Sequence, residues 1–303
     1  MKAELTFFGT GTSQGVPIIG CRCPVCTSPD DKDKRLRSSA FIRYGGLSIL
    51  VDAGPDFRMQ MLRAGISHLD AILLTHNHKD HTGGLDDIRS LNYIDHRAVD
   101  IWCEAPVLET LKREYGYAFA EKKYPGSPEW HVHLIGNRPF SIIPDKEPKT
   151  LEWVHDVGYR YRMPDGTLTE CGPMVDEASD AEDGVRIIPI RGFHGTMPVL
   201  GFRFGDIAYI TDMSAIPEEE FSKLKGLKHL TLNTVTYGPH HSHFSLDEAL
   251  ELAGRIGAGN TWLTHLSHNF PPHEEFSRQL ESLCAERRIR SVVRPAYDGL
   301  TIC

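Results

Sequence analysis

"LLTHNHKDHTGG", Leu73–Gly84, places three histidines and an aspartate within six positions directly after an apolar run. Histidine is not a strong former of strands or helices, so folding alone does not account for so dense a cluster. A helix would pair residue 76 with 80, and a strand would turn 81 away from the others. We therefore expect a loop that binds metal ions through these side chains, which are His76, His78, Asp80 and His81.

These four residues do not complete two metal sites. A hydrolytic metal keeps one position open for water and takes roughly three protein ligands. The remaining candidates each come at or just past the end of a predicted strand: His194 in RGFHG, Asp212 in AYITDMS and His265 in TWLTHLSH. A lone histidine is more often a satisfied structural residue, but the joint presence of the three favours ligands. We assign Asp212 the bridging role, because a carboxylate has two oxygens.

Predicted strands and helices alternate over most of the chain. AELTFFG reads as a strand, and SSAFIRYGGLSILVDAG reads as a hairpin across Gly45 and Gly46. Helices are expected in SLDEALELAGRI and from Glu274 to Glu286. Strands precede helices within each half, which favours mixed sheets over an all-parallel sheet. We expect a single domain over residues 1–303, with an insertion or lid at about 124–185, where proline, glycine and acidic residues separate short β-like pieces.

Composition limits the classes of function. The 303 residues are 40% hydrophobic and 24% charged, which is typical of a globular protein, and no apolar run is long enough to cross a bilayer. The N-terminal stretch lacks the pattern of a signal peptide, so we expect a soluble cytoplasmic protein. A net charge of −8 disfavours a nucleic acid as partner, because phosphate backbones are held mainly by Lys and Arg.

THNHKDHTGGLDDI resembles the signature of the metallo-β-lactamase fold, and the later strand-end residues match that family in order and context. The resemblance implies an α+β fold, the αββα sandwich, with two mixed β-sheets packed face to face and helices outside. It also implies that Asp52 in ILVDAG supports the metal loop from beneath. It implies two ions: the first bound by His76, His78 and His194, the second by Asp80, His81 and His265, with Asp212 shared.

A second cluster, GCRCPVC, holds three of the seven cysteines, Cys21, Cys23 and Cys26. In a cytoplasmic chain such spacing favours metal thiolates over disulfides, with free surface thiols as the alternative. Together with GTGTSQG and HLSH, this cluster resembles the phosphodiesterase branch that includes phosphoribosyl cyclic phosphodiesterase. The resemblance implies a structural zinc held by the three cysteines and His268. A Cys3His site is closed and tetrahedral and leaves no vacancy for a substrate.

GPHHSHFSLDEAL contains three histidines before a helix that Ser245 would cap. The position of His243 before FSLDEA resembles that of the general acid of the same branch, and His241 would bind a phosphate oxygen. Chance enrichment or simple solvation is the competing explanation, above all for His240.

These features predict a hydrolase with a dinuclear zinc or manganese site. A metal-bridging hydroxide would cleave a small cyclic or nucleotide-like phosphodiester, with Asp80 and His243 as catalytic residues. Alternatives are an RNA-processing endonuclease resembling tRNase Z, a thioester or lactam hydrolase, and a non-catalytic zinc-binding protein. The acidic balance argues against the first, the cysteine site against the second, and the intact ligand set against the third. Expected partners are a small phosphodiester and, as one option, a second copy in a homodimer, rather than a nucleic acid or a membrane.

Overall fold

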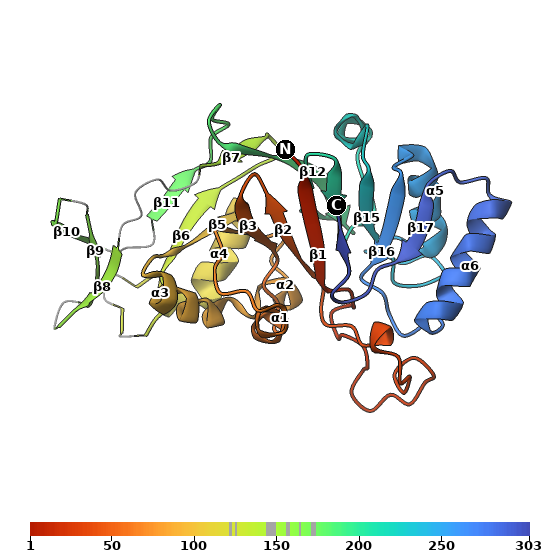
Figure 1. Ribbon diagram of the computed structural model, residues 1–303, viewed down its shortest axis with the longest axis horizontal. Coiled ribbons are helices and arrows are strands. Elements are labelled where there is room, and N and C mark those ends of the chain that lie inside the picture. Colours follow the sequence, from red (N-terminus) through yellow and green to blue (C-terminus); the bar gives the residue numbers. More distant parts are fainter. Residues whose placement is uncertain (121–122, 125, 144–149, 156–157, 164, 171–173) are drawn as a thin grey trace. The chain divides into compact units, whose positions relative to one another are not determined.

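The computed structural model describes residues 1–303 except 121–122, 125, 144–149, 156–157, 164 and 171–173. The chain divides into two compact units (Figure 1). The first unit comprises Met1–Gly45 and Ile187–Cys303, and the second comprises Gly46–Arg186. Each unit contains strands and helices.

The first unit contains a small antiparallel sheet and a larger mixed one. β1 (Ala3–Gly9) pairs antiparallel with both β2 (Ser39–Tyr44) and β18 (Thr301–Ile302). The larger sheet has the order β17-β16-β15-β14-β13-β12, antiparallel from β12 to β14 and parallel from β14 to β17. Its strands are β12 (Val185–His194), β13 (Met197–Phe204), β14 (Ile207–Tyr209), β15 (His229–Asn233), β16 (Asn260–Thr264) and β17 (Val292–Pro295).

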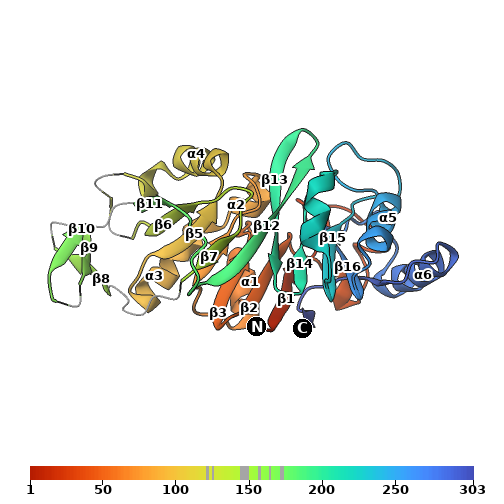
Figure 2. The ribbon, with the colours of Figure 1, turned by 90° about the horizontal axis from the view of Figure 1, so that it is seen from above.

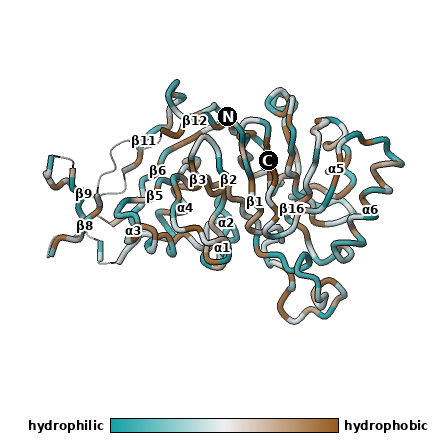
Figure 3. Tube along the Cα trace, viewed as in Figure 1, coloured by the Kyte–Doolittle hydropathy of each residue, from teal (hydrophilic) through white to brown (hydrophobic). Residues whose placement is uncertain are grey.

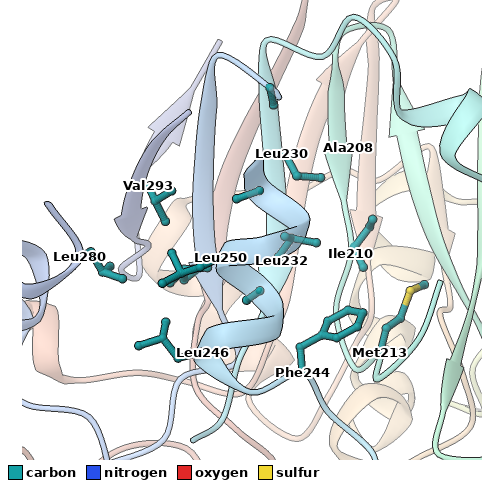
Figure 4. Packing of buried hydrophobic residues seen from close by; sticks show 14 of the residues in the cluster. Ala208, Ile210, Met213, Leu230, Leu232, Phe244, Leu246, Leu250, Leu280 and Val293 are labelled. Carbon is teal, nitrogen blue, oxygen red and sulfur yellow. The ribbon is translucent and has the colours of Figure 1, made fainter. Parts of the chain in front are cut away.

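Two long helices of the first unit lie against the larger sheet, α5 (Leu246–Ile256) and α6 (His273–Glu286), as Figures 1 and 2 both show. The buried residues of α5 recur at the spacing of one helix face, and they pack in the core that Figure 4 shows. Ser245 caps α5 in a capping box with Glu248, which confirms the predicted cap. Two 3-10 helices, η1 (Asp31–Asp33) and η4 (Glu218–Leu224), complete the unit.

The second unit is built on a parallel sheet of the order β11-β6-β5-β4-β3. Its strands are β3 (Leu47–Val51), β4 (Ala71–Leu73), β5 (Val99–Cys103), β6 (Trp130–Leu134) and β11 (Met174–Glu177). Its helices are α1 (Phe57–Ala64), α2 (Lys79–Thr82), η2 (Leu85–Ile88), α3 (Arg89–Asp95), α4 (Ala105–Glu114) and η3 (Gly116–Ala118). Parallel neighbours bring the carboxyl ends of β3 and β4 to one edge, where Asp52 and the histidine loop follow.

The segment 124–185 carries strands throughout its described part. Besides β6 and β11 of the parallel sheet, it contains β7 (Phe140–Ile142) and a small antiparallel sheet of β8 (Thr150–Val154), β9 (Gly158–Arg162) and β10 (Leu168–Glu170). The predicted insertion includes residues 125, 144–149, 156–157, 164 and 171–173, which lie outside the described residues. The lid role stays a prediction.

Buried positions follow the pleat of the strands. Along β1 the residues alternate between buried and partly exposed over the first half of the strand. Figure 3 colours the trace by hydropathy and shows apolar and polar residues interspersed along the chain. Among the described residues, no helix combines the length and the apolar character that spanning a bilayer requires.

Candidate metal centres

The histidine loop of the second unit runs from Thr75 to Thr82, between β4 and the end of α2. The ring centroid of His76 lies 4.7 Å from that of His78 and 4.2 Å from that of His81. Nε2 of His81 lies 3.3 Å from Oδ2 of Asp80. This separation matches the roughly 3.3 Å expected between two ligand atoms on one zinc with bonds of about 2.0–2.2 Å. The donor atoms of the loop therefore fit a divalent ion.

Asp52 holds this loop from inside the unit. Its buried carboxylate accepts hydrogen bonds from the Thr75 N–H at 2.9 Å, from the Thr75 hydroxyl at 2.9 Å and from Nδ1 of His81 at 2.7 Å. Burial raises the pKa of Asp52, against the opposing effect of His81. Donation from Nδ1 leaves Nε2 as the ligand nitrogen of a neutral His81. The predicted supporting position of Asp52 agrees with this geometry.

Close backbone packing explains the glycine beside Asp52. A Cβ added at Gly54 would lie 1.9 Å from the carbonyl oxygen of Asp80, so no side chain fits there. Asp52 itself adopts a left-handed φ of 62°, a conformation that a short polar side chain tolerates. The loop is thus fixed by backbone contact as well as by hydrogen bonds.

The first unit contributes three predicted ligands, each at or just beyond a strand end as expected. His194 is the last residue of β12, Asp212 follows β14, and His265 directly follows β16. Nδ1 of His265 lies 3.2 Å from Oδ2 of Asp212 and 3.1 Å from Oγ of Ser38. Nδ1 of His194 donates to the backbone carbonyl of Asp212 at 3.1 Å, which leaves Nε2 as the ligand atom of a neutral ring. Asp212 and His265 have φ values of 58° and 57°.

His243 stands among these three residues. Its ring centroid lies 4.6 Å from that of His194 and 4.7 Å from that of His265, and its Nδ1 lies 3.8 Å from Oδ1 of Asp212. Within the described part of the chain this buried Nδ1 has no hydrogen-bond partner. Burial, together with His265, lowers the pKa of His243 to about 3. Donor atoms of His194, Asp212 and His243 all lie within 4.8 Å of one another, so His243 can face a metal ion or its substrate.

The other two histidines of GPHHSH are His240, whose ring lies near that of His243, and His241, which follows beyond His240. The ring of His240 lies 5.1 Å from that of His243, and His241 stacks on His240 at 4.6 Å with an exposed side chain. Chance enrichment or solvation was the competing explanation for His240, but its ring lies beside that of His243. Its signal was its place three residues before His243.

The cysteine cluster also lies in the first unit. Nδ1 of His268 is 3.2 Å from Sγ of Cys21, 3.5 Å from Sγ of Cys23 and 3.7 Å from Sγ of Cys26. A tetrahedral zinc with Zn–S of about 2.3 Å and Zn–N of about 2.0–2.1 Å separates S and N by roughly 3.6 Å. The four donors converge as a closed zinc site requires.

Backbone N–H groups point at the sulfur atoms of this cluster. The amide of Cys26 donates to Sγ of Cys23 at 3.4 Å, and the amide of Ile18 donates to Sγ of Cys26 at 3.4 Å. Burial works against the thiolate of Cys23, but the hydrogen bonds from Cys26 and His268 hold its pKa at about 6. Burial raises the pKa of Cys26 to about 11 in the absence of an ion. A bound cation would reverse that burial effect, since coordinated thiols are deprotonated.

Comparison with known proteins places these features in a family. Residues 48–266 match the family model described as "Beta-lactamase superfamily domain". A crystal structure of a diphosphatase from the PhnP family is 33% identical with a TM-score of 0.76, over 100% of this chain and 98% of that one. Ribonuclease Z of Mycolicibacterium gilvum is 24% identical over 92% of each chain.

A longer relative also matches. An octanoyltransferase of Porphyromonas gingivalis is 36% identical over 96% of this chain, and the chain spans 50% of the length of that protein. The family match extends from β3 through the histidine loop to the residue after His265. Proteins of this fold bind divalent metal ions such as zinc. The chain therefore belongs to the metallo-β-lactamase superfamily of hydrolases, has the fold of that family, and resembles its PhnP branch, as its motifs predicted.

Proposed function

We propose that this hydrolase is a metal-dependent phosphodiesterase that acts on small cyclic or nucleotide-like phosphodiesters. The observation that carries the proposal is His243, a largely buried imidazole beside Asp212, His194 and His265, whose buried Nδ1 has no hydrogen-bond partner in the described chain. A proton donor next to a set of metal ligands is the arrangement that cleavage of a P–O bond needs. The 33% identical diphosphatase supports this class of reaction.

In this proposal the two catalytic ions, zinc or manganese, are bound by His76, His78, Asp80, His81, His194, Asp212 and His265. The donor types suit both metals, since each accepts imidazole and carboxylate. Bound there, such cations would supply a water of pKa about 7, in place of 15.7 in bulk, and positive charge beside the phosphoryl group. A third ion, zinc, is held by Cys21, Cys23, Cys26 and His268.

The protein groups have distinct tasks in the reaction. His243, which is neutral because its pKa is lowered to about 3, donates its ring N–H as a hydrogen bond to the departing oxygen and stabilises the charge that develops there. His241, exposed beyond His240, binds a phosphate oxygen of the substrate. Asp52 fixes the ring of His81, and Asp80 adds the negative charge that a divalent ion requires.

Ribonuclease activity is the second candidate, because the relatives include ribonuclease Z. An RNA endonuclease needs a basic surface to hold the phosphate backbone. The chain has 33 Lys and Arg against 41 Asp and Glu. This balance favours a small substrate over RNA.

The test compares four substrates on the full chain loaded with zinc or manganese. They are bis-p-nitrophenyl phosphate, a five-membered cyclic ribose phosphodiester, a dinucleotide with a diphosphate bridge, and a precursor transfer RNA. Asp212→Ala and His243→Ala are compared with wild type. His68→Asn serves as the matched control, because His68 pairs with Asp70 and Asp95, neither of which is a proposed metal ligand. Metal content is counted by mass spectrometry for each variant.

We expect turnover of a small diester that falls by roughly 10²–10³-fold in His243→Ala with its metal retained. Asp212→Ala should lose both metal and activity, and His68→Asn should keep both. Cleavage of the RNA alone would move the assignment to the ribonuclease. Full metal content without turnover of any of the four substrates would contradict the phosphodiesterase.

A further inference from the structure

A second group of metal-type side chains lies in the second unit, on strands that the proposed reaction does not use. This strand cluster consists of Asp100 on β5 with His131 and His133 on β6, whose donor atoms could hold a metal ion, and of Asp176 on β11, which contacts both histidines. In the parallel sheet Asp100 is the register partner of His131, and Asp176 is the register partner of His133. Register partners share a face, and so do residues two apart on one strand. The pairing therefore brings four donors from three strands to one face.

The distances within the strand cluster are those of ligands around one ion. Oδ1 of Asp100 lies 3.2 Å from Nδ1 of His131 and 3.1 Å from Nε2 of His133. The ligand atoms of these three residues lie within 4.8 Å of one another. A tetrahedral zinc with bonds of about 2.0–2.2 Å needs ligand atoms roughly 3.3 Å apart. Asp176 adds carboxylate oxygens at 3.2 Å from Nε2 of His131 and 2.6 Å from Nδ1 of His133.

Proton counting shows that two neutral histidines do not satisfy this arrangement. All four ring nitrogens face a carboxylate oxygen, at 2.6 to 3.2 Å. A neutral imidazole has one N–H, so two neutral rings satisfy two of the four contacts. In each of the other two contacts, a nitrogen lone pair faces an anionic carboxylate oxygen, which is repulsive. Two positive charges are missing, and one divalent cation supplies both.

The alternative source of these charges is protonation of both rings. The two ring centroids are 4.3 Å apart, so two imidazolium ions would repel each other at close range. A single cation beside Asp100 instead contacts Nδ1 of His131, Nε2 of His133 and a carboxylate oxygen of Asp100, and the remaining N–H of each ring donates to Asp176. A donor set of two imidazoles and one carboxylate, with a further position for water, is one that zinc accepts.

Aromatic rings pack against one side of the site, and its side chains are still exposed to solvent. Trp102, the register partner of His133, stacks on that ring at 4.1 Å, and Phe140 stacks on Trp102 at 5.0 Å. This stacking fixes the orientation of His133. The side chains of His133, His131, Asp100 and Asp176 are 14%, 24%, 35% and 49% exposed, so an ion can enter from solvent.

We propose that Asp100, His131 and His133 form a zinc-binding site that is additional to the dinuclear centre and the cysteine site, with Asp176 accepting the N–H groups on the far side of both rings. The ion links β5 to β6, and the hydrogen bonds to Asp176 fasten β11 to the same site. No step of the proposed hydrolysis passes through these four residues.

The test is a zinc titration of the full chain that already carries its other ions, with bound zinc counted by mass spectrometry after gel filtration. His133→Asn removes a ligand, Asp176→Asn removes the acceptor that orients both rings, and the exposed Asp176 makes its variant the less disturbing one. The matched control is His68→Asn, because His68 also has both nitrogens against carboxylates, at 2.7 and 3.1 Å, but has a single imidazole. Hydrogen exchange of the β11 amides is measured with and without zinc.

We expect wild type and His68→Asn to bind one zinc more than His133→Asn, and Asp176→Asn to bind it at least about tenfold more weakly. Zinc should slow amide exchange in β11 of wild type and leave it unchanged in His133→Asn. Equal zinc counts in wild type and His133→Asn, with both folded, would overturn the proposal. Equal affinity in wild type and Asp176→Asn, with no zinc effect on β11 exchange, would also overturn it.

Discussion

The cysteine cluster and the histidine loop each place metal-binding side chains close together in the sequence, but the two sets suit ions with different roles. In the cysteine cluster, four donors surround one point and three are sulfur, so an ion there has a complete shell. In the histidine loop, imidazoles and a carboxylate are presented by a strand end, and a buried carboxylate beneath them fixes one ring. Closure and sulfur suit a structural ion, whereas nitrogen and oxygen donors with an open position suit a hydrolytic one.

The supports of the two regions differ in the same way. The cysteine loop packs on a small apolar cluster that includes Val16 and Val25, with Ile18 against it. Without an ion, its sulfur atoms rely on long hydrogen bonds from the amides of Ile18 and Cys26. The histidine loop is held by Asp52, by Thr75 and by the backbone packing at Gly54. Loss of the ion should therefore affect the shape of the first region and the chemistry of the second.

The largest effect should come from removing a donor of the histidine loop. His78→Ala takes one imidazole from the proposed dinuclear site, and we expect activity to fall by at least roughly 10²–10³-fold, as when a group that stabilises transition-state charge is removed. Steady-state kinetics and metal counting measure it. An unchanged metal count with activity within a few-fold of wild type would remove His78 from the ligand set.

Asp52 tests whether support beneath the loop matters to chemistry. Asp52→Asn keeps the acceptor oxygen for Thr75 but places an amide group where Nδ1 of His81 now donates at 2.7 Å. We expect metal affinity or activity to fall by about 10–100-fold, the usual cost of losing such an orienting group. A competition titration with a chromogenic chelator measures the affinity. Equal affinity in wild type and variant would show that backbone packing alone orients the loop.

Local sequence patterns predicted the features that depend on a few adjacent residues. The spacing of His76, His78, Asp80 and His81 argued against one regular element for all four and predicted a loop. The structure has His76 and His78 in a loop, whereas Asp80 and His81 lie in the short helix α2. The cap at Ser245 and the strand-end places of Asp212 and His265 were equally readable, because each depends on a few adjacent residues. The mixed sheets followed from the order of strands and helices, and the family match confirms the fold.

The strand cluster could not be predicted, because it depends on register. Asp100, His131 and Asp176 are separated by some 31 and 45 positions along the chain, and parallel pairing of β5, β6 and β11 aligns them. The pair HVH at 131–133 was the single local signal, and its period of two fits a half-exposed strand equally well. The nearness of His240 to His243 was missed for a related reason, since a loop has no period from which side-chain direction follows.

A smaller effect, on stability, should come from the cysteine cluster. Cys23→Ser should lower the zinc count by one and leave activity of the folded protein within a few-fold. Zinc at 100 times its Kd contributes about 2.7 kcal/mol, which corresponds to a Tm lower by roughly 5–10 °C in its absence. Calorimetry with equal free zinc measures it. The control is Cys303→Ser, an exposed thiol, and an equal Tm in the two variants would contradict the structural zinc.

The other end of the cysteine loop is attached to α6 without a metal. The N–H of His273 donates to Oδ1 of Asp33 at 2.8 Å, and Nδ1 of His273 lies 3.3 Å from a guanidinium nitrogen of Arg35. Burial, followed by the charges of Arg35 and Lys32, lowers the pKa of His273 from 6.5 to about 4, against the opposing carboxylates of Glu274 and Asp30. His273 is therefore neutral in the folded protein at neutral pH.

The smallest effect we expect is the pH dependence of this attachment. Between about pH 6.5 and 4 the unfolded chain binds a proton at His273 and the folded chain does not, so folding stability falls as pH falls through that window. His273→Gln cannot take up this proton, and its Tm should fall less than that of wild type between pH 7 and 4.5. Because all other histidines are common to both proteins, the difference between the two curves isolates His273. Parallel curves would mean that His273 has the same pKa in the folded and the unfolded chain, and that it contributes nothing to the pH dependence of stability.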